Sequence, residues 1–512
     1  MSRATRTPRG SLTLDRLRRD GEAFSIEISR EYYLAHSGQK ASADLQPIYA
    51  RHADVTSAEA LGVALDAFKA SADGSEERRG ARLLLDWQVD AQSGRELAAL
   101  EEREIAWEAS AVVSVADGRQ IEYEAVAIEI ANAADARERH AIEAGRATLV
   151  EKELASLRRE RFERERDITV QLGLAGDYNK TWELLSGISL EGLSAECEQF
   201  LKDTESLWDE VLPRFAKRVL DMTPAELTRA DALALFRARE FDAYFPPARM
   251  EESISKQVRD MGVDPLAHQR IRLDTGEREG KRARAFCSPV RIPEEVYLVL
   301  RPHGGQTDWT TFLHELGHAL HFAYMRPDLP FEYRWLGDNS ITEAYAMLFD
   351  HRMQDPAWLK RYTELGASNI PTFRRSSGFE ELHFLRRYCA KLIYEVQLYN
   401  AANWDAVPDM YVDILTKATT FRYSRADAFV DVDARFYAAR YLRAWQLQAL
   451  LNETLTERYD VDWWRNPRAG PWICSALFGE GQRELAHEQA ERVAGKPLSF
   501  APLVRAVESM LA

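Results

Sequence analysis

The sequence predicts a mainly helical protein with two lobes and one small β-sheet. Apolar residues recur at spacings of three and four through residues 20–222, as in Leu154–Leu157, which is the pattern of amphipathic helices. Between Ile271 and Leu300 the pattern changes to short runs rich in β-branched residues around a glycine turn, which predicts strands. After Gly304 and Gly305 the helical spacing returns and continues to the last residue.

The pattern divides the chain into three segments. Residues 1–19 are rich in arginine and lack the apolar stretch of a secretory signal, so we expect a flexible tail. Residues 20–205 are expected to form an N-terminal helical lobe. Residues 206–512 are expected to form a second lobe, which contains the chemical motif described below and the C-terminal helices.

Composition and charge exclude several classes of protein. Hydrophobic residues make up 46% of the 512 residues and charged residues 29%, which is typical of a globular protein. The formal net charge of −15 argues against a nucleic-acid-binding protein, because phosphate recognition needs a basic surface. Apolar runs such as Val296–Leu300 are far shorter than the roughly 20 residues that cross a membrane.

The four cysteines are scattered and include no C-x-x-C pair, so neither a disulfide framework nor a thiolate zinc site is indicated. We therefore expect a cytoplasmic protein, since thiols stay reduced there.

Two short β-structures are expected within the helical pattern. Ala111–Ala127 contains Val112, Val113 and Val115 before an Asp-Gly turn, which predicts a hairpin. Ile271–Asp274, Lys281–Val290 and Val296–Leu300 are expected to form a small sheet beside the helix that follows.

The strongest chemical signal is the motif H-E-x-x-H, formed by His314, Glu315 and His318. Asp308 is expected to cap the helix that carries it. On that helix the two histidines lie one turn apart on one side, where they can share one zinc ion at about 2.0–2.1 Å. Glu315 then lies beside the metal and can take a proton from bound water.

Other interpretations of the motif are a surface helix that happens to hold two histidines, or a closed structural zinc site. The structural site needs a fourth protein ligand, and no cysteine lies close by in the sequence. The metzincin pattern fails, because His321 and Tyr324 stand where it requires Gly and His.

A catalytic zinc needs a third protein ligand, and the carboxylates downstream are Glu332, Asp338 and Glu343. We favour Glu343, separated from His318 by 24 residues (319–342), with Asp338 as the main rival. Glu343 also fits a capping box with Ser340 as the N-cap, in which case its carboxylate would bond to the backbone.

These motifs resemble those of the M3 zinc oligopeptidases, a family that includes thimet oligopeptidase and oligoendopeptidase F. The resemblance rests on Asp308–His321 and on the spacing to Thr342-Glu343-Ala344. Weaker similarity spans most of the chain, at Ile130–Arg137, Gly187–Thr204, Ala285–Pro289 and Phe436–Trp445.

The resemblance implies a two-lobed helical zincin fold with a deep central channel that admits oligopeptides and excludes folded proteins. It implies His314, His318 and Glu343 as zinc ligands and Glu315 as general base. The family also has an acidic residue seven positions after the third ligand, which is Asp350 here. Positions i and i+7 share a helix face, so Asp350 could accept a hydrogen bond from a zinc-bound imidazole; alternatively it pairs with solvent or Arg352 on the helix surface.

The groups that stabilise the transition state are less clear from the sequence. The family supplies a histidine and tyrosines from a later segment, but residues 384–486 contain no histidine. Tyr437 and Tyr441 lie at i and i+4 and could both face the cleft as oxyanion donors, or pack as an aromatic stripe in the core. His303 is another candidate.

The predicted function is zinc-dependent hydrolysis of internal bonds in short peptides, with water activated by zinc and Glu315. An edge strand near Ala285–Val290 could hold the peptide by β-addition. Two alternatives stay open: a zinc carboxypeptidase of the M32 type, and a non-catalytic helical protein stabilised by zinc.

Overall fold

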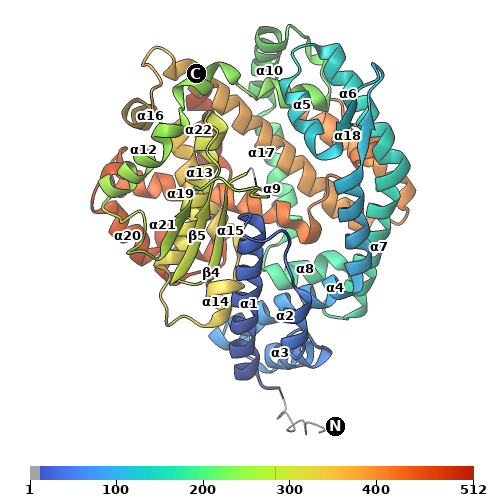
Figure 1. Cartoon of the computed structure of the whole chain (residues 1–512), viewed down its shortest axis with the longest axis vertical. Coiled ribbons are helices and arrows are strands. Elements are labelled where there is room, and N and C mark those ends of the chain that lie inside the picture. The colour runs from blue at the N-terminus through green and yellow to red at the C-terminus, as the bar shows by residue number, and fades with distance from the viewer. Residues whose placement is uncertain (1–11, 283) are drawn as a thin grey trace.

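Helices make up most of the structure, a computed structural model that describes residues 12–282 and 284–512 (Figure 1), and the mainly helical prediction is confirmed. The first nine are α1 Leu14–His36, α2 Gln46–Arg51, α3 Ala58–Ala70, α4 Glu76–Ser110, α5 Val126–Asn132, α6 Ala136–Leu149, α7 Ala155–Gln171, α8 Tyr178–Ser186 and α9 Leu190–Asp203. The next are α10 Glu205–Leu220, α11 Arg229–Leu235, α12 Pro247–Asp260, α13 Gln306–Tyr324, α14 Phe331–Trp335, α15 Asn339–Asp350, α16 Pro356–Tyr362 and α17 Ile370–Asn400. The last are α18 Val407–Thr419, α19 Tyr437–Tyr459, α20 Ala469–Ala476, α21 Ala486–Ala494 and α22 Ala501–Leu511.

Both predicted β-structures are present. β1 Val112–Ser114 and β2 Gln120–Glu122 form the expected antiparallel hairpin. The other sheet has the order β3-β5-β4, in which β3 Ile271–Asp274 runs parallel to β5 Glu295–Val299 and β4 Phe286–Arg291 runs antiparallel to β5. β4 is therefore an edge strand of this sheet.

The strand predicted over residues 281–290 begins only at Phe286. Before it, the buried amine of Lys281 donates to the backbone oxygens of Asp274 and Gly276 at 2.8 and 2.9 Å and to the Asp274 carboxylate at 3.1 Å. The buried cation is therefore paired, and these bonds tie Lys281 to the end of β3 rather than to the sheet ladder.

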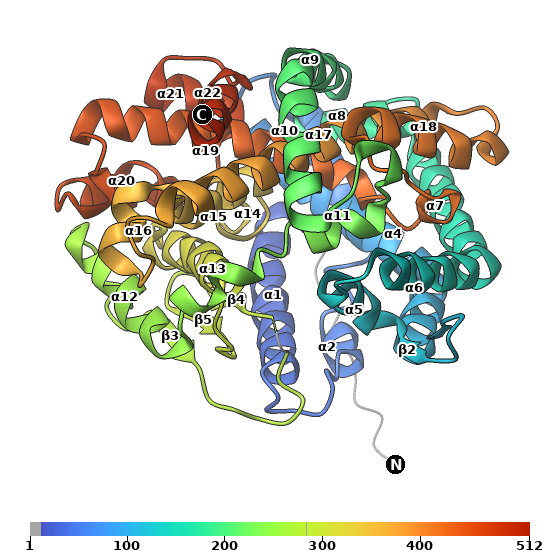
Figure 2. The ribbon, with the colours of Figure 1, turned by 90° about the horizontal axis from the view of Figure 1, so that it is seen from above.

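One hydrophobic cluster connects most of the helices, and it runs from Leu12 to Met510. Within it, α15 packs against α13 and α19, while α17 packs against α9, α18 and α22. Figure 2 shows α13, α15 and the three-stranded sheet on one side of α1, and α5, α6 and α7 on the other. The predicted lobe boundary at residue 205 falls between α9 and α10, and the division into two lobes stays a prediction.

The expected flexible tail is wrong for its last residues. α1 begins at Leu14, Leu17 is fully buried, and the Arg18 guanidinium donates to the Glu332 carboxylate at 2.7 Å. Burial of Leu17 stabilises this segment, since full burial of a leucine contributes about 1.5–3 kcal/mol. Residues 1–11 lie outside the described part of the chain.

Among the helices that the structure describes, none is long and apolar enough to cross a membrane.

Candidate metal centre

The two histidines of the motif and Glu343 come together where α13 packs against α15. Their ligand atoms all lie within 4.8 Å of one another. The Glu343 Oε2 atom is 3.4 Å from His314 Nε2 and 3.7 Å from His318 Nε2. This oxygen is buried without a hydrogen-bond partner, as expected of an atom placed to bind a cation.

Gly317, inside the motif, explains why the two helices approach so closely. A Cβ atom at this position would lie 2.6 Å from Ala346 Cα and 2.9 Å from the Tyr345 carbonyl oxygen. Only glycine therefore permits this backbone contact. The contact sets the distance between the histidines of α13 and Glu343 of α15.

The start of α13 differs from the prediction. The helix begins at Gln306, and Asp308 is inside its first turn rather than at the N-cap. The Asp308 carboxylate reaches back and accepts the backbone N–H groups of His303 and Gly304 at 2.6 and 2.8 Å. It thus stabilises the preceding loop. The His303 side chain is exposed and does not line the cavity beside His314.

The three candidate carboxylates have different partners at and near the start of α15. Asp338 is the N-cap, and its two oxygens accept the backbone N–H groups of Ser340 and Ala486 at 2.9 and 3.2 Å. Ser340 is inside the helix, so the capping box predicted for Ser340 and Glu343 is wrong. Asp338 is therefore occupied as a cap, Glu332 pairs with Arg18, and Glu343 is left facing the histidines.

The other ring nitrogens of both histidines also have partners. His314 Nδ1 is 2.8 Å from Asp350 Oδ2, and His318 Nδ1 is 2.8 Å from the Thr342 hydroxyl. Such contacts orient imidazoles so that Nε2 faces a metal. The alternative for Asp350 does not occur, since Arg352 bonds instead to the Asn452 side chain at 2.9 Å.

Burial and neighbouring charges shift the pKa values of the two histidines in opposite directions. Burial lowers the pKa of His314, but the hydrogen bond to Asp350 and the nearby carboxylate of Glu343 outweigh it and raise this pKa to about 10. Burial, together with the charge of His314, lowers the pKa of His318 to about 4. The same cluster therefore affects the proton affinities of its two histidines in opposite directions.

The Glu315 side chain extends from α13 to the edge strand β4. Its Oε2 atom accepts the Cys287 backbone N–H at 2.8 Å. Burial raises the pKa of this carboxyl group above its usual value.

The two tyrosines of α19 lie beside the site, and Tyr441 also packs against the hydrophobic core. Tyr437 donates its hydroxyl to Glu343 Oε1 at 3.0 Å, and its ring lies 5.0 Å from that of Tyr441. Tyr441 in turn contacts the edge of Tyr388 from α17, a residue that sequence reasoning missed. Both α19 tyrosines are only half-buried, whereas Phe436 and Trp445 form the buried part of the aromatic stripe.

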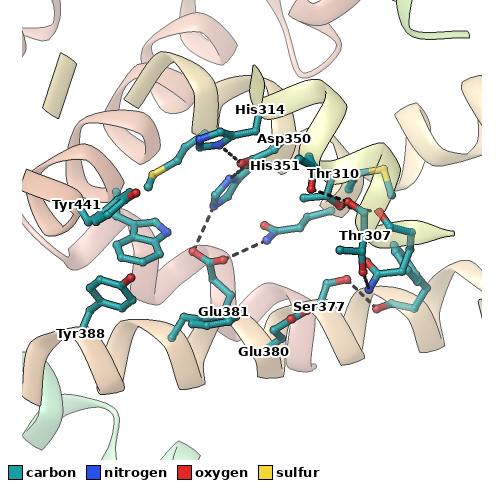
Figure 3. Close-up of a pocket in the computed structure, with 18 of the residues that line it drawn as sticks. Thr307, Thr310, His314, Asp350, His351, Ser377, Glu380, Glu381, Tyr388 and Tyr441 are labelled. Carbon is teal, nitrogen blue, oxygen red and sulfur yellow. Dashed lines mark hydrogen bonds and ion pairs between the residues drawn. The ribbon is translucent and has the colours of Figure 1, made fainter. Parts of the chain in front are cut away.

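Two cavities adjoin the metal centre, and they share Tyr388 and Tyr441 as a wall. The first has a volume of about 370 Å³ and includes His314, Asp350, His351, Glu380 and Glu381 in its lining (Figure 3). The second has a volume of about 680 Å³ and contains Trp87, Trp182 and Trp335. These two cavities are compatible with the expected deep channel, which stays a prediction.

The donor set fits a catalytic zinc ion. Two imidazole nitrogens and one carboxylate oxygen are a known zinc-hydrolase set that leaves the fourth position open. Within the described part of the chain, these three residues form the one cluster of this kind. That composition disfavours a closed structural site, which would need a fourth protein ligand.

No protein-family model and no curated protein sequence matches this chain. Many solved structures are similar to it, and three of them each cover 97% of its length. A "putative peptidase" from Chlamydophila abortus has a TM-score of 0.69 at 14% identity over 89% of that chain. A "putative oligoendopeptidase F" from Bacillus anthracis has a TM-score of 0.66 at 15% identity over 90% of its chain. A Pyrococcus furiosus carboxypeptidase has a TM-score of 0.61 at 15% identity over 97% of its chain. At these identities the likeness shows the fold, so the chain shares the mainly helical architecture of these three structures.

Proposed function

We propose that this protein is a zinc-dependent peptidase that cleaves internal bonds in short peptides. The observation that carries the proposal is the cluster of His314, His318 and Glu343, whose ligand atoms lie within 4.8 Å, with the Glu315 carboxylate on the same helix. The names of the three similar structures, two peptidases and a carboxypeptidase, support the same class of reaction.

His314, His318 and Glu343 would hold the zinc ion. When bound, zinc polarises a peptide carbonyl group and makes a water molecule more acidic. Asp350 and Thr342 keep the two imidazole rings oriented through their Nδ1 atoms.

Glu315 acts as the general base and then as the acid. Its Oε2 atom is held by the Cys287 N–H, which leaves Oε1 to take the proton of the attacking water. The raised pKa of this carboxyl group makes it a stronger base toward the water proton, which it then passes to the leaving amine.

Two further features position the substrate. The hydroxyl groups of Tyr437 and Tyr441 would donate to the carbonyl oxygen as it gains charge. Tyr441 is the freer of the two, because its hydroxyl makes no hydrogen bond within residues 12–282 and 284–512. β4 is an edge strand beside Glu315, so its backbone groups could pair with an extended peptide. We place the activity in the cytosol, which suits four free cysteines.

The test is mass spectrometry of a mixed peptide library incubated with zinc-loaded wild type and Glu315→Gln. Internal cleavage by the wild type, lowered about 10²–10⁴-fold in the variant, is expected because a general base contributes this much. Glu102→Gln, which changes an exposed carboxylate of α4, is the control and should cleave like wild type. Removal of C-terminal residues alone would assign a carboxypeptidase instead. If all three proteins bind zinc and none cleaves any peptide, the result would favour a non-catalytic zinc protein.

A further inference from the structure

His351 connects the candidate metal centre to α17. It follows α15 directly, and its Nδ1 atom lies 2.5 Å from Asp350 Oδ1 while its Nε2 atom lies 3.2 Å from Glu381 Oε1 (Figure 3). The other oxygen of Asp350 is on His314 Nδ1 at 2.8 Å. A continuous chain of four side chains therefore runs from Glu381 to a candidate zinc ligand.

This chain is well shielded from solvent. The side chains of His351, Asp350 and Glu381 are 12%, 14% and 11% exposed. Both ring nitrogens of His351 face carboxylate oxygens, and only the protonated ring can donate to both. Burial opposes this charge, but Glu381 and Asp350 outweigh it and raise the pKa of His351 to about 10. His351 is thus the cation that directly contacts Asp350 on the side away from His314.

We propose that His351 is a positioning residue that strengthens zinc binding by holding Asp350 against His314. The inference rests on the zinc site of the proposed function. With one oxygen held by His351, the Asp350 carboxylate cannot rotate freely, and its other oxygen keeps the His314 ring turned with Nε2 toward Glu343. Loss of such outer partners typically weakens metal binding about 10–100-fold.

Two substitutions separate the contacts that His351 makes. An asparagine amide can replace the Nδ1 donor toward Asp350, whereas a glutamine amide can replace the Nε2 donor toward Glu381. If the Asp350 contact matters, His351→Asn should keep zinc affinity within about threefold, and His351→Gln should weaken it about 10–100-fold. In an Asp350→Asn background, His351→Gln should then change zinc affinity less than about twofold, because the route through Asp350 is already broken.

The measurements are the zinc dissociation constant, obtained by competition with a chromophoric chelator, and the melting temperature of the metal-free protein. Control substitutions at His383 replace a buried histidine of α17 that packs against Phe236 and Phe421, away from the metal cluster. His383→Asn and His383→Gln should lower the melting temperature and leave zinc affinity unchanged.

Equal loss of zinc affinity in His351→Asn and His351→Gln, or no loss in either, would overturn the inference. A persistent tenfold effect of His351→Gln in the Asp350→Asn background would do so as well. Other results would contradict the proposed function. They are a wild-type protein that does not bind zinc, or one that binds zinc and cleaves no peptide.

Discussion

Replacing Gly317 by alanine should weaken both the fold and the metal centre. The added Cβ atom would lie 2.6 Å from Ala346 Cα, where carbon atoms normally keep about 3.5–4.0 Å, so α13 and α15 must separate by roughly 1 Å. Overpacking of this kind costs about 1–3 kcal/mol. Alanine regains up to about 1 kcal/mol through its higher helix propensity. With the full regain, we expect a net loss of up to about 2 kcal/mol in the free energy of unfolding, and no gain.

The effect on zinc follows from the same displacement. Zinc bonds to nitrogen and oxygen ligands are about 2.0–2.2 Å long, so moving Glu343 by roughly 1 Å removes much of its contribution. We expect the zinc dissociation constant to rise at least tenfold, which corresponds to about 1.4 kcal/mol.

Urea unfolding of the metal-free protein and chelator competition measure the two effects. The matched control is Gly94→Ala in the interior of α4, where nothing lies within 4 Å of the added Cβ. This variant should be stabilised by about 0.5–1 kcal/mol and bind zinc normally. If Gly317→Ala behaved like Gly94→Ala in both assays, the argument that Gly317 sets the ligand spacing would be refuted.

Three further predictions concern single side chains. Glu343→Ala should lose zinc in metal analysis, whereas Ser340→Ala should retain it; full zinc occupancy in Glu343→Ala would remove Glu343 from the ligand set. Tyr441→Phe should lower turnover about tenfold or more with an unchanged melting temperature, because its hydroxyl has no structural partner within the described residues; unaltered turnover would exclude an oxyanion role. Burial, reinforced by Arg387 and Arg386, lowers the pKa of His383 to about 3, so the folded protein binds this proton less well than the unfolded chain with its pKa of about 6.5. The stability that neutral His383 contributes is complete above about pH 6.5 and falls toward pH 3 by up to about 1.4 kcal/mol per pH unit. His383→Leu should remove this slope in urea unfolding between pH 6 and 4.5, and an unchanged slope would contradict the assignment.

Features that depend on local spacing were predictable from the sequence. The i, i+4 separation of His314 and His318 placed both rings on one side of a helix, and the structure has them there facing Glu343. The valines around the Asp-Gly turn also predicted the β1–β2 hairpin correctly. In each case neighbours in the sequence set the geometry.

Features that depend on distant partners were missed or assigned wrongly. Asp338 rather than Ser340 caps α15 because Asp338 also accepts the N–H of Ala486, which is 148 positions away. The role of His351 depends on Glu381, which comes from another helix 30 positions later. Leu17 orders the start of α1 because it is buried in a core built from the whole chain. No local pattern reports such contacts.

The long helix α17 carries two residues of the cavity wall on one continuous element. Its 31 residues form a rod of about 46 Å at 1.5 Å per residue, which carries both Glu381 and Tyr388. A continuous helix resists local bending, so these two parts of the cavity wall must move together. Arg386, between them, is anchored to α9 and its end through the Leu201 carbonyl at 2.9 Å and the Thr204 hydroxyl at 2.7 Å. A displacement of α9 that α17 follows would therefore move Glu381 and Tyr388 together, as one wall of the cavity, rather than one at a time.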